Sequence, residues 1–293
     1  MSPDGNPTVH ACVVSWNVRG PLWSCLASLE RQEGVDLHIT VVDNDSHDGS
    51  AEMVREEFPE VTLLEPGENL GFARGANLGF EGSTAEFLML LNPDTRLKRN
   101  AFIGLVGTIK EDHQNGVVAP RLVYEDGTIQ PSARRFPTFG SELSHYTGLD
   151  VLWRANPWRS RYMMLDFPHD RRMEVDQPMG AALLIRRSVW EEVGGMDGEF
   201  PLYFEDVDIC YRVKRAGWRI VFDPGSEVVH LAHASTKQSR KRAVEMRRLG
   251  MLRFAKKHGL ARPGGLGLLR AVSWVQVRLR QALDEDRMPF KVW

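Results

Sequence analysis

Short apolar runs alternate with amphipathic stretches along the first part of the chain, as far as about residue 119. The apolar runs predict strands at Val9–Ser15, Leu37–Val42, Val61–Leu64, Phe87–Leu91 and Val117–Ala119. The stretches between them predict helices at Pro21–Arg31, Ser50–Phe58, Ala73–Glu81 and Asn100–Asp112. This alternation is typical of βαβ units with right-handed crossovers, and it predicts an α/β fold whose central, mostly parallel sheet is flanked by helices.

The pattern changes between Pro120 and Gln177, where arginine, proline and aromatic residues predict a loop-rich insertion with short helices. Regular elements are expected again after it. They are a strand at Gly180–Arg186, a helix at Ser188–Val193 with Ser188 as its cap, a helix at Glu205–Ala216, and short strands at Trp218–Phe222 and Glu227–His230. From Thr236 the chain is predicted to be helical, with a break at residues 262–265.

Composition narrows the class of protein. The 293 residues are 42% hydrophobic and carry a net charge of −2, which suits a globular core and argues against a generic nucleic-acid-coating protein. The three cysteines show no paired spacing, so neither a disulfide framework nor a thiolate metal site is expected. The polar N-terminus lacks a basic lead into an apolar run, and no apolar run reaches the roughly 20 residues that span a bilayer. These features predict a cytoplasmic protein.

The first candidate for chemistry is Asp94. The apolar run Phe87–Leu91 ends in Asn92-Pro93-Asp94, and a run this apolar is typical of a strand buried on both faces. Ligands of open α/β sheets bind at the carboxyl ends of such strands, so Asp94 is placed where a metal or a phosphate group is bound. Mg²⁺ and Mn²⁺ prefer oxygen ligands of this kind. The alternative is that Asp94 only caps a turn.

Two loops that precede helices are further candidates. Residues 43–50 follow the second strand with carboxylates and amides beside a helix N-terminus, and residues 69–77 follow the third strand with Gly71, Gly75 and Arg74. Both could contact a nucleotide, and both could equally be a capped polar turn or a turn with a helix-packing glycine. The sequence has neither the P-loop motif nor a G-x-G-x-x-G after the first strand, which argues against P-loop NTPases and dinucleotide oxidoreductases.

A second acidic cluster opens the helix predicted at Glu205. Glu205, Asp206 and Asp208 exceed what helix capping needs, although the helix dipole also favours acids there. Crowded carboxylates raise one another's pKa, which suits a general base. His230 follows a short strand and could complete a metal site, or it could be structural.

In combination and in order, these segments resemble the inverting glycosyltransferase family 2, which has the GT-A fold, and in particular its rhamnosyltransferase-like branch. The resemblance runs from Val9 to about residue 235. The matching segments are Val13–Asn17, Val41–Ser46, Asn69–Phe72, Leu90–Asp94, Gly180–Ala182, Gly194–Asp197, Tyr203–Asp208 and His230.

The resemblance implies a role for each of these positions. Asp43 or Asp45 would bind the base and ribose, and Asp94 would be the last acid of the family's D-x-D element, whose first acid is Asn92 here. Asp206 would be the catalytic base in a Glu-Asp pair with Glu205. Asp94 and His230 would hold Mg²⁺ or Mn²⁺. The nucleotide-sugar site would comprise Ser15, Asn17, Asp43, Asp45, Asn69, Gly71, Arg74, Asn77, Asn92 and Asp94.

The activity that follows is inverting transfer of a sugar, such as the deoxysugar rhamnose, from a dTDP-sugar donor to a cell-wall or surface glycan, which can be polyprenyl-linked. The alternatives are a UDP- or GDP-sugar donor, or a non-catalytic module that binds glycans or nucleic acid. We favour the enzyme, with no nucleic-acid partner, because two carboxylate sites are expected at opposite ends of the sheet region. The catalytic domain would be residues 1–235, with a nucleotide-sugar half at 8–119 and an acceptor half at 120–235.

The acceptor side is expected to include Trp153, Trp158, Gly180, Ala181 and Tyr203, since aromatic faces stack on sugars. Residues 236–293 would form a basic, amphipathic helical extension. Its helix at 267–283 places Leu268, Val272, Val275, Leu279 and Leu283 on one face and also carries Trp274. That face could contact an anionic membrane surface, which would make the protein peripheral on the inner face of the cell membrane. It could equally pack on the catalytic domain or on another subunit of a homo-oligomer.

Overall fold

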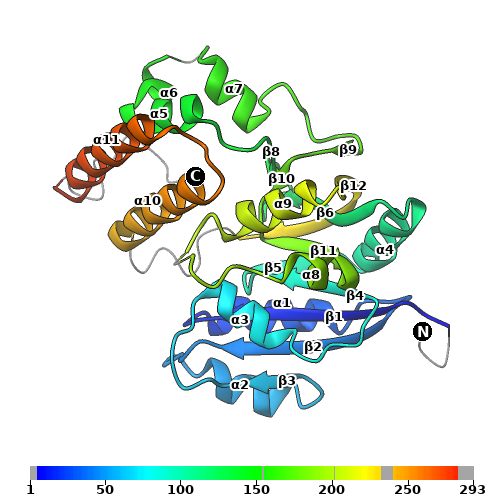
Figure 1. Ribbon diagram of the computed structural model, residues 1–293. Coiled ribbons are helices and arrows are strands. Elements are labelled where there is room, and N and C mark those ends of the chain that lie inside the picture. The colour runs from blue at the N-terminus through cyan, green and yellow to red at the C-terminus, as the bar shows by residue number, and fades with distance from the viewer. Residues whose placement is uncertain (1–4, 154, 201, 232–239, 283–293) are drawn as a thin grey trace.

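The computed structural model describes residues 5–153, 155–200, 202–231 and 240–282. A ten-stranded sheet forms its centre, and eight of the strands follow the order β3-β2-β1-β4-β11-β6-β12-β5 (Figure 1). The strands of this order are β1 (Thr8–Ser15), β2 (Asp36–Asp43), β3 (Thr62–Leu64), β4 (Phe87–Leu91), β5 (Thr95–Leu97), β6 (Asn115–Val123), β11 (Ala182–Arg186) and β12 (Arg219–His230). The short strands β7 (Ile129–Gln130) and β9 (Met173–Glu174) pair with β6 and β12, while β8 (Ala133–Arg134) and β10 (Gln177–Pro178) form a separate ribbon.

The first four strands pair in parallel, which confirms the predicted βαβ units. Strand β11 differs, because it runs antiparallel to both of its neighbours, β4 and β6, so the sheet as a whole is mixed. The two short strands expected near the end of this region are one strand, β12, whose pairing with β6 shifts register between Asp223 and Glu227. The shift accounts for the interruption of the sequence pattern there.

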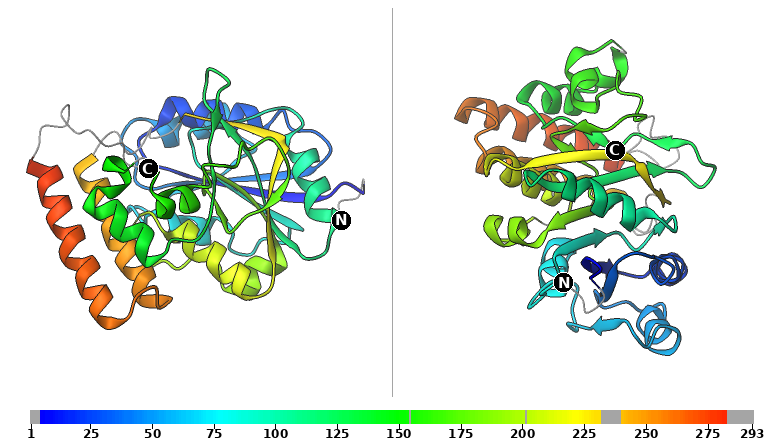
Figure 2. Two further views of the ribbon diagram at one scale, coloured as in Figure 1. Left: turned by 90° about the horizontal axis from the view of Figure 1, so that it is seen from above. Right: turned by 90° about the vertical axis from the view of Figure 1, so that its right-hand side faces the viewer.

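Helices cover both faces of the sheet, as Figure 2 shows. The helices that alternate with the first strands are α1 (Arg19–Leu29), α2 (Ser50–Glu57), α3 (Phe72–Gly79) and α4 (Ala101–Glu111), followed later by α8 (Arg187–Val193) and α9 (Glu205–Arg215). Strand β1 sends Val9, Ala11 and Val13 into the core beneath α1, α2 and α4, and sends Cys12 and Val14 into the core beneath α3, α8 and α9. The alternation is that of a strand buried on both faces. Helix α8 begins after Arg186 without a side-chain cap, so the expected cap at Ser188 is wrong.

A third core lies in a layer of helices beside the sheet, which we call the helical layer. It contains α5 (Phe139–Thr147), α6 (Leu149–Leu152), α7 (Pro157–Met163), α10 (Arg240–Lys257) and α11 (Pro263–Ala282). Its buried centre includes Tyr146, Met251, Phe254 and Leu269, and Phe204 joins it from the start of α9. The short helices predicted in the insertion are therefore present as α5, α6 and α7. Among the described helices, none combines the length and the apolar character needed to cross a membrane.

The C-terminal helices are present, but the break between them lies at a different place. It was expected at residues 262–265 and is found between Lys257 and Pro263, so residues 263–265 belong to α11. Leu283 and residues 232–239 lie outside the described part. Of the residues expected on one face of α11, Leu268, Val275 and Leu279 are exposed, and Val272 packs partly against the helical layer. Leu269 and Val277, which were not predicted to do so, are the residues of α11 that are buried in the core.

Candidate active site

The carboxyl ends of β1 and β2 present two buried polar atoms side by side. Ser15 and Asp43 are paired residues of these parallel strands, and both are buried. One carboxylate oxygen of Asp43 accepts a hydrogen bond from the Ser46 amide at 2.8 Å. The other oxygen, Oδ2, and the hydroxyl of Ser15 meet no hydrogen-bond partner among the described residues. Because buried polar atoms are nearly always paired, this pair of atoms points to a polar ligand.

The loop that follows β2 is braced by Asn17 and Asn44. Asn17 has a positive φ of 52°, and its side-chain oxygen accepts a hydrogen bond from the His47 amide at 2.7 Å. The Asn44 side chain accepts a hydrogen bond from the Leu70 amide and donates one to the Gly71 carbonyl oxygen. Asn44, which was absent from the predicted site, thus ties the two candidate loops together. Asp45 is exposed at the tip of its loop, 3.7 Å from His47.

The loop and helix at residues 69–77 contact a distant part of the chain. Asn69 accepts a hydrogen bond from the Gly71 amide at 3.0 Å, and Gly71 adopts the positive φ of 77° that favours glycine. Asn77 exchanges two hydrogen bonds with the backbone of Met196, at 2.8 and 2.9 Å. Arg74 donates to the Gly198 carbonyl oxygen at 3.1 Å. Arg74 and Asn77 therefore hold the 194–198 loop in place, whatever contact they make with a ligand.

Asp94 and His230 lie together at the start of β5 and the end of β12. These strands pair antiparallel, which places His230 opposite Thr95. Oδ1 of Asp94 lies 3.4 Å from Nε2 of His230, and both residues are buried. Gln130, on β7, accepts the proton of His230 Nδ1 at 2.8 Å. Nε2 is therefore the ring nitrogen of His230 that faces the carboxylate, and an imidazole nitrogen and a carboxylate oxygen this close can both be ligands of one metal ion.

This pair fits a divalent cation that takes part of its shell from the substrate. No group of three or more histidine, cysteine or acidic side chains suited to a metal occurs in the described part of the chain. Mg²⁺ and Mn²⁺ at nucleotide sites commonly take one or two protein ligands, and the phosphates supply others. Gln130 was missed by the sequence reasoning because it lies in the irregular insertion.

The second acidic group lies at the first turn of α9. The Asp206 carboxylate accepts hydrogen bonds from the amides of Gly180 at 3.1 Å and Val207 at 2.8 Å. Burial raises the pKa of the Asp206 carboxyl despite these two donors. Burial also raises the pKa of Glu205 to about 8, with a further contribution from the Asp206 charge. At neutral pH Glu205 therefore holds a proton, and Asp206 is the member of the pair that is partly exposed to solvent.

The backbone before this pair is strained and is held by a helix of the helical layer. Tyr203 and Phe204 both have positive φ, 63° and 71°, which bulky residues rarely adopt. Gly250 of α10 packs on this turn so closely that a Cβ there would lie 2.4 Å from the Tyr203 carbonyl oxygen. The conformation of this turn sets the direction in which the Glu205–Asp206 pair points, and the packing of Gly250 stabilises the turn.

Asp208 belongs to the packing of α9 and not to the reactive pair. It is fully buried, and it accepts from Arg212, Lys257 and His258 at 2.7 Å each. Burial alone would raise the pKa of Asp208, but these donors hold it below its usual value. The carboxylate is thus the ionic anchor of α10 on α9.

The two acidic groups are linked through the neighbouring strands β4 and β11. The amide of Asn92, two residues before Asp94, donates to the carbonyl oxygen of Ala181 at 2.9 Å, and the next residue back, Gly180, donates to Asp206. The expectation that the two carboxylate sites occupy opposite ends of the sheet region is therefore wrong. Strand β11 inserts antiparallel beside β4 and brings them together.

Trp153 follows α6 directly, and Trp158 lies in the first turn of α7, two helices of the helical layer (Figure 1). Both are about half-exposed, and their rings meet edge to face at 6.4 Å. The structure brings Gly180, Ala181 and Tyr203 next to Asp206 but leaves these two tryptophans in a separate cluster, so their role toward an acceptor stays a prediction.

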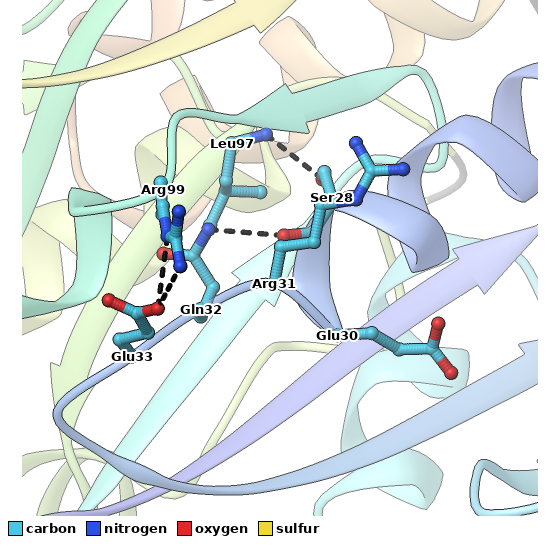
Figure 3. A pocket seen from close by; sticks show the side chains of 7 residues that line it. All are labelled: Ser28, Glu30, Arg31, Gln32, Glu33, Leu97 and Arg99. Carbon is cyan, nitrogen blue, oxygen red and sulfur yellow. Dashed lines mark hydrogen bonds and ion pairs between the residues drawn. The ribbon is translucent and has the colours of Figure 1, made fainter.

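A pocket of about 510 Å³ lies elsewhere, between the end of α1 and β5 (Figure 3). Helix α1 starts near the carboxyl end of β1 and runs back, so its C-terminal residues lie at the sheet edge away from Asp43. The walls of the pocket are bonded to one another. Arg99 pairs with Glu33, and Gln32 donates to the carbonyl oxygens of Ser28 and Lys98.

A mixed α/β sheet flanked by helices, with Asp43 and Asp94 at the ends of its strands and the Glu205–Asp206 pair at the start of α9, agrees with the GT-A fold of glycosyltransferases. The chain belongs to glycosyltransferase family 2, because the model of "Glycosyltransferase like family 2" matches residues 7–248. The N-acetylglucosaminyl-diphospho-decaprenol L-rhamnosyltransferase of Mycobacterium tuberculosis is 31% identical over 222 residues, which are 72% of each chain. A low-salt glycan biosynthesis hexosyltransferase of Haloferax volcanii is 25% identical over 60% of this chain and 52% of its own.

Solved structures agree with the fold. The mannosyltransferase of Pyrobaculum calidifontis, solved with GDP-mannose and Mn²⁺, matches 97% of this chain and 77% of its own with a TM-score of 0.60 at 18% identity. The structure of GalNAc-T7 with UDP, GalNAc and Mn²⁺ matches 78% of this chain and 44% of its own, with a TM-score of 0.59 at 17% identity. The protein is thus an enzyme, and the reading as a non-catalytic binding module is set aside.

Proposed function

We propose that the protein is an inverting glycosyltransferase that moves a deoxysugar such as rhamnose from a dTDP-sugar to a polyprenyl-diphosphate-linked glycan of the cell wall or cell surface. The observation that carries the proposal is a continuous path of residues that leads from Asp94 through Asn92, Ala181 and Gly180 to Asp206. This path places the proposed metal site close to a carboxyl group whose pKa is raised by burial. The rhamnosyltransferase relative supports the sugar and the acceptor class. A UDP- or GDP-sugar donor is the alternative, since neighbours with those nucleotides share the fold.

The donor would bind along the carboxyl edge of β1, β2 and β4. Ser15 and Asp43 offer the two buried polar atoms that need partners, and ribose hydroxyls or a base edge would supply them. Asp94 and His230 would hold Mg²⁺ or Mn²⁺ against the diphosphate. When bound, the metal neutralises the negative charge that develops on the leaving nucleoside diphosphate.

The reaction is then a single displacement. Asp206 takes the proton from the acceptor hydroxyl, and the acceptor oxygen forms a bond to the anomeric carbon of the sugar. The bond from that carbon to the diphosphate oxygen breaks with its electron pair on the leaving group. Attack opposite the leaving group inverts the anomeric configuration. Protonated Glu205 places no charge next to Asp206 and so leaves Asp206 as the base.

The exposed apolar residues of the helical layer support contact with an anionic membrane. Leu268, Trp274, Val275 and Leu279 are exposed on α11, and Arg278 stacks over Trp274 at 5.5 Å. Leu152, Trp153 and Trp158 add exposed apolar surface on α6 and α7, which pack on α5 as α11 does. Apolar side chains with tryptophan and arginine beside them suit the interface of an anionic bilayer, where a polyprenyl acceptor resides.

Vesicle sedimentation would test the membrane contact. The paired substitution Val275→Ser and Leu279→Ser should reduce binding to vesicles that contain phosphatidylglycerol. Ile103→Ser, at an equally exposed position of α4, should leave binding unchanged and serves as the matched control. Equal binding of both variants would remove α11 from the contact.

Thermal stability with dTDP, UDP or GDP, each with and without Mn²⁺, would test the donor and the metal. Ligand at about 100 times its dissociation constant adds about 2.7 kcal/mol to the free energy of unfolding. We expect a rise in Tm that needs Mn²⁺ and is largest with dTDP. A larger rise with UDP or GDP would establish the alternative donor, and no rise with any of the three would overturn the proposal.

A further inference from the structure

A buried arginine outside the predicted site lies near the proposed catalytic base. Arg134 belongs to β8, which pairs with β10 so that Arg134 stands opposite Gln177. Only 9% of Arg134 is exposed. Strand β10 packs on α9, the helix that begins with Glu205 and Asp206 (Figure 1). Because a guanidinium group is always charged in proteins, the β8–β10 ribbon brings a permanent positive charge to this helix.

The backbone links this ribbon to Asp206 itself. The amide of Met179, the residue after β10, donates to the carbonyl oxygen of Ser132 at 2.9 Å. The amide of the next residue, Gly180, donates to Oδ2 of Asp206 at 3.1 Å. The ribbon therefore holds in place both Arg134 and one of the two amides that bind the carboxylate.

On its own helix, Asp206 has two titratable neighbours. Glu205 precedes it, and a pKa of about 8 leaves Glu205 protonated at neutral pH. Cys210 lies one turn further along α9, and burial together with the Asp206 charge raises the pKa of its thiol, so this group is neutral as well. Neither neighbour supplies a charge that would stabilise an ionised Asp206.

Two arginines of other elements approach the same turn. Arg247 of α10 lies 5.5 Å from the ring centre of Phe204 and faces Glu142, with 3.6 Å between Nη2 and Oε2. Arg134 has an Nε that meets no acceptor in the described part of the chain. Burial raises the pKa of the Asp206 carboxyl, and the charge of Arg134 acts against this effect, as do the two backbone amides.

We propose that Arg134 is a positioning residue of the transfer reaction, which acts through Asp206: its buried guanidinium, held by the β8–β10 ribbon, stabilises the ionised form of the base. The inference rests on the proposed function, in which Asp206 takes the proton of the acceptor. Only an ionised carboxylate can accept that proton. Arg134 thereby keeps the base ready in a site whose burial favours the protonated form.

Carbon-13 NMR of protein labelled at the aspartate carboxyl carbons would test this link without any substrate. The Asp206 signal is assigned by its loss in Asp206→Asn. In Arg134→Gln we expect the pKa of Asp206 to rise by about one, the low end of what a neighbouring opposite charge produces. Arg134→Lys keeps the charge and should restore most of the wild-type value. Arg135→Gln, at an exposed neighbour that pairs with Asp176 at 3.7 Å, is the matched control and should leave the pKa unchanged.

The pH profile of kcat, measured with dTDP-rhamnose and a short polyprenyl-diphosphate-linked N-acetylglucosamine, would show whether the link serves the reaction. The base works when ionised, so a raised pKa moves the acid limb of the profile to higher pH. For Arg134→Gln we expect kcat to be about tenfold lower than that of the wild type on the acid side, and to approach it on the alkaline side. A loss of kcat by one factor at every pH would indicate a structural role only and would overturn the inference.

The inference would also be overturned by an unchanged Asp206 pKa in Arg134→Gln, or by equal rises in Arg134→Gln and Arg134→Lys. Arg134→Met removes the charge but keeps an apolar stem, so it gives the same test where Arg134→Gln fails to fold. Absence of turnover in the wild type, with the expected NMR shift in the variant, would instead overturn the proposed function, which keeps the two failures distinct.

Discussion

The Asp94 carboxylate lies 3.4 Å from Nε2 of His230, the ring nitrogen that does not bond Gln130. A carboxylate oxygen and an imidazole nitrogen at this distance can both be ligands of one cation. Gln130 makes this possible, because it fixes the proton on the far nitrogen of the ring. A residue of the irregular insertion therefore sets the chemistry of a site formed at the end of the sheet.

Substitution of Gln130 by leucine should weaken metal-dependent nucleotide binding about tenfold, since loss of such a supporting hydrogen bond typically costs 10- to 100-fold in metal affinity. Calorimetry with the nucleotide and Mn²⁺ would measure it. Binding in EDTA should be the same for both proteins, and an unchanged affinity with Mn²⁺ would show that Gln130 does not act through the metal.

Replacement of Asp206 by asparagine should lower kcat by about 10²- to 10⁴-fold, the usual contribution of a general base. The dissociation constant of the nucleotide should not change, because the amide keeps the shape of the side chain. Glu199→Gln, an exposed acid in the preceding loop, provides the control and should keep full activity. Turnover of Asp206→Asn near the wild-type rate would assign the base elsewhere.

Gly180 leaves room for Asp206, since an added Cβ would lie 2.7 Å from the Asp206 Cβ. Gly180→Ala should therefore displace the carboxylate and reduce kcat at least about tenfold while nucleotide binding persists. The matched variant Gly107→Ala, in the middle of α4 with open space around it, should keep kcat and raise stability by about 0.5–1 kcal/mol. Similar kcat values for the two variants would contradict the close packing described here.

The free energy of unfolding should fall as the pH rises from about 4.5, the ordinary pKa of a glutamate, to about 8. The pKa of Glu205 is about 8 in the folded protein, above its ordinary value, so between these values the folded state holds a proton that the unfolded state has lost. Glu205→Gln removes this dependence, and its free energy of unfolding should exceed that of the wild type by a few kcal/mol at pH 8 but not at pH 5. Urea unfolding at both pH values would measure the difference, and parallel pH dependence in the two proteins would exclude the effect.

The sequence predicted those parts of the fold and site that depend on local patterns. Phe87–Leu91 is buried as its composition indicated, and Asp94 follows it at the predicted edge. Gln130 and Arg134 escaped prediction because short strands in an irregular segment place them, and their pairing partners are distant in sequence. The antiparallel insertion of β11 was missed for the same reason, since an apolar strand of five residues has no intrinsic direction.

The residues predicted to bind the nucleotide also differ in how much of their environment the sequence could predict. Ser15 and Asp43 end regular strands, and each has a buried polar atom that meets no partner in the described part of the chain, so their contact with a nucleotide stays a prediction that has structural support. Asn77 shows what a motif cannot reveal, because both of its amide atoms bind the backbone of Met196, more than a hundred residues away. Its contact with a nucleotide, like those of Asn17, Asp45, Asn69 and Arg74, stays a prediction.

The fit of Gly250 beneath the Tyr203 carbonyl oxygen has a consequence for the shape that the enzyme can take in other settings. A shortened protein that ends after β12 would keep the sheet and every residue predicted to bind the nucleotide, yet it would lose the helix that holds residues 203 and 204 in their unfavourable conformation. Such a fragment would relax at the turn and release Asp206. Truncation should therefore abolish deprotonation of the acceptor while binding of the donor persists. The C-terminal helices would then be required for catalysis and not only for stability.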